Sequence, residues 1–172
     1  MRYAMLLAGF AVLLRGPAAT TTERREAVLR NGSGAEVGKV TLREDDKKLK
    51  LHVEVHGLPA GMHGMHLHMT GKCDGPDFQT AGGHLNPGGT MQHGHKNPKG
   101  PHLGDLGNLK VGGKMKGETT VNVSGPEAAK GLKSFLALGQ GGIAVVIHAS
   151  ADDEMTDPSG SSGARIACAV LQ

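Results

Sequence analysis

The clearest pattern in the chain is the strict alternation of aliphatic and polar residues between positions 48 and 56. Leucine or valine occupies positions 49, 51, 53 and 55, and lysine, histidine or glutamate occupies the positions between them. Because successive side chains of a strand point to opposite faces, this pattern predicts a half-buried strand with His52 and His56 on its solvent face.

Other segments carry weaker versions of the same signal. Val40 and Leu42 alternate with polar neighbours before a polar turn, and positions 114–123 contain a similar alternation. The apolar run at 143–148 predicts a buried strand, and positions 164–171 predict the last strand of the chain. Positions 126–138 predict a helical turn, which Gly131 keeps short.

The composition supports a β-rich fold. The chain has 172 residues, the length of a single domain, with 28 glycines, three phenylalanines, one tyrosine and no tryptophan. An aliphatic interior with many glycine turns predicts an all-β sandwich or barrel. The net charge of +3 comes without a dense block of lysine and arginine or an aromatic platform for bases, so we expect no nucleic-acid partner.

The N-terminal segment differs from the rest of the chain. Arg2 precedes an apolar stretch at 3–14 that is too short to span a bilayer, and small residues at 18–19 offer a cleavage site. We therefore expect 1–19 to be a secretory signal peptide, 20–25 a polar linker and 26–172 the folded domain. This predicts export to the periplasm or the medium, with no membrane contact after cleavage. A frayed terminus or a retained membrane anchor is the alternative.

The chain has two cysteines, Cys73 and Cys168. In an exported protein an even pair predicts one disulfide, which would close a loop of about 95 residues and contribute about 4–5 kcal/mol on chain-entropy grounds. Two unrelated buried thiols are the alternative.

Seven of the ten histidines lie between positions 63 and 102, and three of these seven fall in the segment 71–99, which has no apolar period. So long a stretch is uncommon in a compact domain unless it is functional, and bound metals would give it order. His66 and His68 are two positions apart, so on a strand their imidazoles share a face about 7 Å apart. His148 ends another predicted strand and could complete the site. Several imidazoles with one carboxylate suit zinc and copper.

Six short motifs, in order along the chain, resemble those of the copper/zinc superoxide dismutases, in particular their exported bacterial branch. The resemblance covers about residues 26–172. The motifs are Gly64-Met65-His66-Leu67-His68, Gly71-Lys72-Cys73, Gly82-Gly83-His84-Leu85-Asn86-Pro87, His102-Leu103-Gly104-Asp105-Leu106-Gly107-Asn108, Val146-Ile147-His148-Ala149 and Gly163-Ala164-Arg165-Ile166-Ala167-Cys168.

The resemblance implies a role for most of the clustered residues. It implies a copper bound by His66, His68, His84 and His148. It implies a zinc bound by His84, His93, His102 and Asp105, with His84 bridging the two ions. His93 matches only with a one-residue insertion, and His95 is the alternative. The remaining implied roles are a carboxylate link between the two sites for Asp152, a structural role for His63, substrate guidance for Arg165, and a disulfide between Cys73 and Cys168.

The same resemblance implies the fold and the activity. The fold is an eight-stranded Greek-key β-barrel or sandwich of immunoglobulin-like form, with the metals under two long loops. The activity is dismutation of superoxide to dioxygen and hydrogen peroxide by a redox-cycling copper beside a structural zinc, an antioxidant defence outside the cytoplasm. The catalytic residues it implies are His84 and Arg165, the partner is the superoxide anion, and a homodimer is compatible with the family.

Two other functions stay open at this point. The chain could bind copper or zinc without turnover, or it could be a purely structural β-sandwich, which would leave the histidines unexplained. Two positions also depart from the family pattern. Met65 stands where an aromatic residue is usual, and the acidic segment 152–158 lacks a lysine that guides substrate in some relatives. Lys96 or Lys99 would then have to supply that charge.

Overall fold

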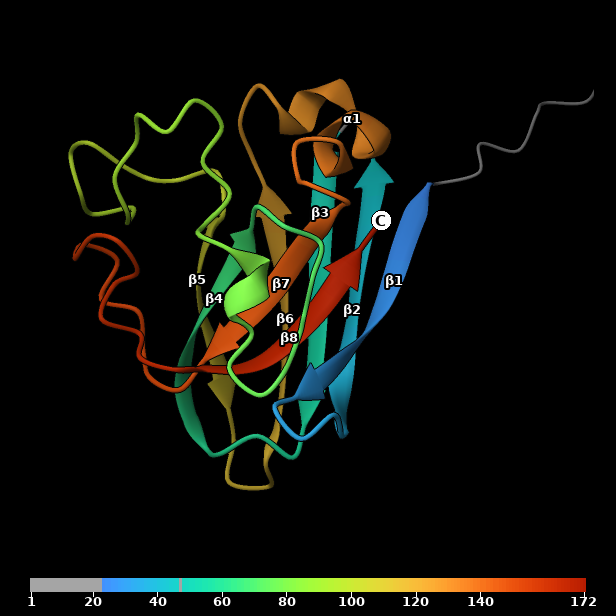
Figure 1. Ribbon diagram of the computed structural model, residues 1–172, viewed down its shortest axis with the longest axis vertical. Coiled ribbons are helices and arrows are strands. Elements are labelled where there is room, and N and C mark those ends of the chain that lie inside the picture. The colour runs from blue at the N-terminus through green and yellow to red at the C-terminus, as the bar shows by residue number, and fades with distance from the viewer. Residues whose placement is uncertain (1–22, 47) are drawn as a thin grey trace, which may run out of the picture.

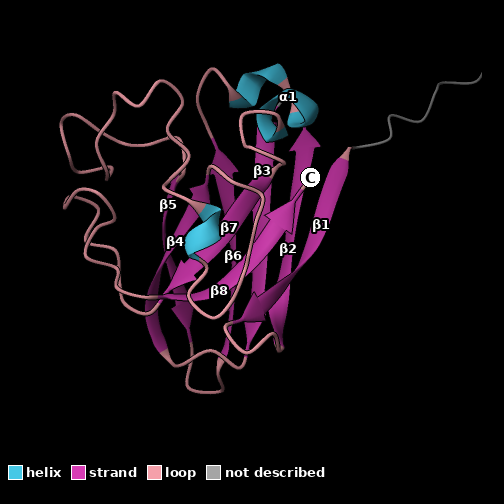
Figure 2. Cartoon of the chain, in the orientation of Figure 1, coloured by secondary structure: helices cyan, strands magenta, loops and turns pink. Residues whose placement is uncertain are grey.

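The fold is a nearly closed antiparallel β-barrel in the computed structural model, which describes residues 23–46 and 48–172 (Figure 1). Almost all of its regular structure is strand (Figure 2), and the expected all-β Greek-key fold is thereby confirmed. The strands are β1 (Arg24–Asn31), β2 (Glu36–Asp45), β3 (Lys48–His56), β4 (Gly61–His68), β5 (Asp105–Val111), β6 (Lys116–Val123), β7 (Ile143–His148) and β8 (Arg165–Leu171). The expected signal peptide, 1–19, lies outside the described residues.

The strands follow the order β5-β4-β7-β8-β1-β2-β3-β6 around the barrel. β3 and β4 are consecutive in the chain but are not neighbours, and the same holds for β6 and β7, which is typical of a Greek key. β5 and β6 are the two ends of this order. The turn at 112–115 joins them at the foot of the barrel, where the Gly112 N–H donates to the Lys116 carbonyl at 2.8 Å.

The strand predicted at 48–56 is β3, and its four aliphatic side chains are buried between the ladders to β2 and β6. His56 is exposed and His52 half-buried, on the solvent face as predicted. Met65 on β4 is fully buried in the aliphatic core with Leu67, where its flexible thioether packs among the aliphatic side chains.

The predicted helical turn at 126–138 consists of a 3-10 turn, η2 (Ala128–Lys130), and a short helix, α1 (Leu132–Leu136). Gly131 separates the two with a φ of 90°, which favours glycine, and the Leu132 N–H donates to Glu44 Oε2 at 2.9 Å. Within residues 23–46 and 48–172, no helix is both long and apolar enough to cross a bilayer.

Two long connections lie side by side at the left of Figure 1. The 69–104 loop joins β4 to β5 and contains the 3-10 turn η1 (Gln79–Ala81), and the 149–164 loop joins β7 to β8. They touch where the Lys96 N–H donates to the Glu154 carbonyl at 3.0 Å. Since neither loop contributes a regular apolar layer, contacts with the barrel and with each other must hold them in place.

Candidate metal centre

Two neighbouring strands carry three of the expected copper ligands. His66 and His68 stand at the end of β4, and His148 ends β7, which pairs with β4 in antiparallel register. His84, in the 69–104 loop, forms an isolated bridge with His68 and so lies beside the same strand end. All four rings are buried and each offers a nitrogen atom, these atoms lying within 4.8 Å of one another.

One nitrogen of each of these rings is buried without a hydrogen-bond partner among residues 23–46 and 48–172. The four atoms are His66 Nδ1, His68 Nε2, His84 Nε2 and His148 Nε2. A buried polar atom without a partner costs about 1–3 kcal/mol, and native proteins keep few of them. Four together therefore indicate a group that all four nitrogens would bind, and an all-imidazole set suits copper.

The opposite nitrogen of each strand histidine is hydrogen-bonded. His68 Nδ1 donates to the Gly82 carbonyl at 2.9 Å, and His148 Nδ1 donates to the Gly163 carbonyl at 3.0 Å. These bonds place the ring proton away from the unpartnered atom, as the outer contacts of metal-binding histidines generally do. Burial lowers the pKa of His66 to about 3 and the pKa of His148 to about 4, so both rings are neutral at pH 7.

The expected zinc ligands converge on one carboxylate oxygen. Asp105 Oδ1 lies 2.9 Å from His84 Nδ1, 3.0 Å from His93 Nδ1 and 3.3 Å from His102 Nδ1. Ligand atoms around a tetrahedral zinc stand about 3.3 Å apart, because each bond is about 2.0 Å long. Asp105 Oδ1 stands near this spacing from all three imidazoles, which suits zinc. The ligand atoms that all lie within 4.8 Å of one another are those of His66, His84, His93 and Asp105, so His102 stands at the margin of this group. His84 thus takes part in both groups, through opposite ring nitrogens.

Asp105 is held in place by the backbone of the 69–104 loop. Its Oδ2 accepts hydrogen bonds from the Gly94 N–H at 2.8 Å and the His102 N–H at 2.9 Å. Burial raises the pKa of this carboxyl, but the hydrogen bonds from His84 and His93 outweigh burial and keep the pKa well below its usual range. Asp105 is therefore ionised at neutral pH.

Asp152 links the two groups across the 149–164 loop. Its Oδ2 lies 2.9 Å from His66 Nε2, and its Oδ1 lies 2.9 Å from His93 Nε2. Burial lowers the pKa of His93, but its hydrogen bonds to Asp105 and Asp152 outweigh burial and raise the pKa to about 9. The two carboxylates therefore fix both edges of the His93 ring.

The structure separates His93 from its alternative. His93 is fully buried between the two carboxylates, whereas His95 is exposed. Gly94 has a φ of 100°, and a Cβ there would overlap the Glu154 carbonyl, so the close approach of the two loops requires glycine directly after His93. These observations favour His93 over His95 as a ligand.

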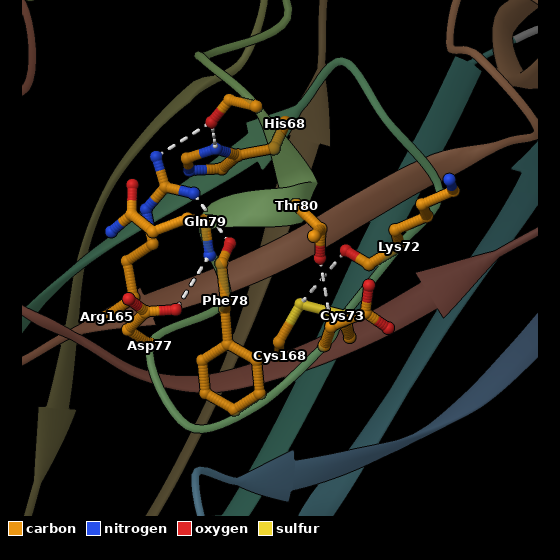
Figure 3. The surroundings of a disulfide bond; sticks show 11 residues. His68, Lys72, Cys73, Asp77, Phe78, Gln79, Thr80, Arg165 and Cys168 are labelled. Carbon is orange, nitrogen blue, oxygen red and sulfur yellow. Dashed lines mark hydrogen bonds between the residues drawn. A yellow bond between two sulfur atoms is a disulfide. The ribbon is translucent and has the colours of Figure 1, made fainter.

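Arg165 is held by the 69–104 loop beside His68, one of the four histidines that could bind copper (Figure 3). Its Nη1 donates to the Phe78 carbonyl and its Nη2 to the Gly82 carbonyl, both at 2.7 Å. The Gly82 carbonyl also accepts the bond from His68, so one backbone oxygen orients both side chains. The disulfide between Cys73 and Cys168, which the structure contains as expected, fastens this loop to β8.

The other expected residues lie near the site without facing its centre. His63 is buried, with Nδ1 2.7 Å from the His148 carbonyl and Nε2 2.9 Å from the Pro59 carbonyl, so it supports β7 and offers no free nitrogen. The exposed Lys96 ammonium lies 3.7 Å from Glu154 Oε2. Lys99 is exposed.

Some groups of the site gave no signal in the sequence. The carbonyl oxygens of Gly82 and Gly163 orient two histidines and the arginine, yet every residue has a carbonyl and no side-chain pattern marks these two. They become visible only when the paths of both loops are known.

Comparisons with known proteins agree with this geometry. A family model described as copper/zinc superoxide dismutase matches residues 36–171. A superoxide dismutase-like protein of Bacillus subtilis is 42% identical over 143 residues, which span 82% of this chain and 72% of that protein. A Cu-Zn superoxide dismutase of Escherichia coli is 33% identical over 181 residues, covering 99% of each chain.

Solved structures give the same result. A superoxide dismutase-like protein from Bacillus subtilis superposes with a TM-score of 0.78 at 39% identity, covering 88% of this chain and all of the other. The Cu/Zn superoxide dismutase from Brucella abortus superposes with a TM-score of 0.70 at 29% identity, covering 87% of this chain and all of the other. With one buried histidine group at the ends of β4 and β7 and a second in the 69–104 loop, and with these matches over most of its length, the chain belongs to the copper/zinc superoxide dismutase family.

Proposed function

We propose that this chain dismutes superoxide to dioxygen and hydrogen peroxide at a copper that His84 joins to a zinc. The observation that carries the proposal is that the two ring nitrogens of His84 face different groups. Its Nε2 belongs to the four-histidine group and has no hydrogen-bond partner among the described residues, while its Nδ1 lies 2.9 Å from Asp105 Oδ1. The copper ligands in this proposal are His66, His68, His84 and His148, and the zinc ligands are His84, His93, His102 and Asp105.

When bound, copper supplies the one-electron cycle that oxidises one superoxide and reduces a second, while zinc, which has no redox chemistry, orders its ligands. The reduction consumes protons. His84 Nε2 would be suited to carry one of them whenever it is not bound to copper, because this nitrogen has no hydrogen-bond partner among the described residues and the other side of its ring is fixed by Asp105. Solvent supplies the second proton.

Arg165 has the position and charge to guide the substrate. Its guanidinium is half-buried, with two of its donor atoms occupied by the Phe78 and Gly82 carbonyls, and it shares the Gly82 carbonyl with His68. Arginine stays protonated in proteins, so a positive charge lies beside the site at all relevant pH values. A fixed cation next to a small site raises the local concentration and the association rate of an anion such as superoxide.

The experiment that tests this function uses protein reconstituted with copper and zinc. We expect rapid superoxide decay after pulse radiolysis and a copper(II) electron paramagnetic resonance spectrum of an all-nitrogen site. His148→Ala should lose most of both, whereas the exposed His56→Ala, a matched control on β3, should keep both. Metal binding without faster superoxide decay would instead identify a metal carrier, and activity of His148→Ala equal to that of the parent would remove His148 from the site.

We propose in addition that the protein acts outside the cytoplasm, after removal of 1–19. The disulfide supports this, because disulfides persist in oxidising compartments, and so do the bacterial Cu-Zn relatives. Cell fractionation with N-terminal sequencing of the mature chain tests the proposal. A chain that keeps residues 1–19 in the cytoplasmic fraction would contradict it.

A further inference from the structure

The carboxylate that joins the two histidine groups sits on a loop without regular structure. Asp152 belongs to the 149–164 loop, yet both of its oxygens lie at hydrogen-bond distance from histidines of different groups. A link of this kind works only if the backbone that carries it is fixed to within a fraction of an ångström. The Glu154 N–H donates to Asp152 Oδ1 at 2.6 Å and orients the carboxylate within its loop, while the contacts of the Asp152 backbone fix that part of the loop against the barrel.

Asn108 makes both of these backbone contacts. The Asp152 N–H donates to Asn108 Oδ1 at 2.8 Å, and Asn108 Nδ2 donates to the Asp152 carbonyl at 2.9 Å. The side-chain amide thus bonds the two polar groups of one residue, as a neighbouring strand would. We call this pair of bonds the Asn108 clamp.

The clamp rests on the rigid part of the barrel. Asn108 lies in β5, four residues before the turn that joins β5 to β6, and pairs with Gly64 of β4. The Gly64 N–H in turn donates to the Ser150 carbonyl at 2.8 Å, so the beginning of the 149–164 loop lies along the β4–β5 pair. A Cβ at position 64 would stand 2.8 Å from the Cβ of Ser162, so glycine there allows the loop to come this close.

We infer that Asn108 is a positioning residue that acts on both histidine groups by clamping the backbone of Asp152. The inference rests on the proposed function for the identity of the metals, and on the hydrogen bonds alone for the clamp. Asparagine suits the task because one short, uncharged side chain offers a donor and an acceptor together. Aspartate at this position would keep the acceptor but place a second oxygen against the Asp152 carbonyl.

The test is a double-mutant cycle on zinc release. Zinc-loaded, copper-free protein is mixed with excess chelator, and the release rate is measured for the parent, Asn108→Ala, Asp152→Ala and the double variant. Partners that orient metal ligands typically change metal affinity by 10- to 100-fold, so we expect Asn108→Ala to speed release about tenfold in the parent. In the Asp152→Ala background the same change should have little effect, because the carboxylate through which it acts is gone. An equal effect in both backgrounds, or none in the parent, would overturn the inference.

Two further variants and two further measurements keep the outcome unambiguous. Asn108→Asp, which matches asparagine in size, should also speed zinc release, and the melting temperature of the metal-free variants shows whether the barrel still folds. Asn122→Ala, an exposed β6 asparagine without a side-chain hydrogen bond among the described residues, should match the parent. Amide hydrogen exchange at Asp152 in metal-free protein reads the clamp without any metal. Exchange that Asn108→Ala leaves unchanged would refute the clamp, whereas failure of the parent to bind zinc would refute the proposed function.

Discussion

Two replacements of Asp105 separate its expected role as a zinc ligand from its role as a hydrogen-bond acceptor for the loop backbone. Its Oδ1 faces the three zinc-group histidines, and its Oδ2 accepts the backbone N–H groups of Gly94 and His102. Asp105→Ala removes both functions. Asp105→Asn keeps an oxygen for the two backbone groups but loses the negative charge that faces the metal.

The expected magnitude follows from the two backbone groups. Both Gly94 and His102 are buried, so the alanine variant leaves two N–H groups without a partner, at about 1–3 kcal/mol each. The free energy of unfolding of metal-free protein should therefore fall by about 2–6 kcal/mol in Asp105→Ala. Asp105→Asn should recover most of this loss, yet both variants should bind zinc far more weakly than the parent.

Urea unfolding of the metal-free variants measures the first quantity, and zinc content after dialysis against a dilute chelator measures the second. Superoxide decay with copper alone checks that part of the activity survives. Zinc content equal to that of the parent in Asp105→Ala would refute the ligand assignment. Equal destabilisation of both variants would refute the structural role of Oδ2.

Two further predictions concern charge. Arg165→Ala should keep both metals and the melting temperature, but superoxide decay should be slower and should depend less on ionic strength. Arg165→Lys should recover part of the rate, because lysine restores the charge without the planar guanidinium. Loss of metal in Arg165→Ala would contradict this prediction. In metal-free folded protein the pKa of His66 is lowered to about 3 and that of His148 to about 4. Below pH 6.5 the unfolded chain therefore binds more protons than the folded protein. The free energy of unfolding should fall as the pH is lowered from 7 to 5. Each ring contributes about 2 kcal/mol to this fall, and the raised pKa of His93, about 9, opposes it by about 1 kcal/mol. Urea unfolding at the two pH values checks the sign, and equal stability at both would show that these rings are solvated.

The hydrophobic pattern predicted strands of two kinds. β3 has strict alternation of buried and outward-facing residues, and β7 is a continuous apolar run that is buried throughout. β5 was missed, because Gly107 adopts a φ of 78° and the β4–β5 register shifts nearby, so the spacing of Leu106, Leu109 and Val111 no longer has a period of two. A strand with such an irregularity has no simple signature in sequence.

The histidines of the site were found from their spacing and from the resemblance to a family, because side chains that bind metals are few in kind. Of the groups that orient these histidines, the resemblance implied Asp152, but neither the backbone carbonyls nor Asn108 was predicted. Asn108 meets Asp152 only because the 149–164 loop crosses β5 at that residue, and the crossing depends on how the whole loop packs. Sequence therefore predicted which groups carry the chemistry, and the structure was needed to show what orients them.

The two histidine groups come from different parts of the fold, and this sets the order in which the protein can mature. His66, His68 and His148 stand on paired strands of the barrel, so their nitrogens converge as soon as the barrel folds. His93 and His102 belong to the 69–104 loop, which buried apolar side chains and the disulfide attach to the barrel. We expect metal binding to order the rest of this loop. The barrel core must therefore be stable enough to remain folded before the metals bind. The supply of copper and zinc, rather than the folding of the chain, would then limit how quickly newly made protein becomes active.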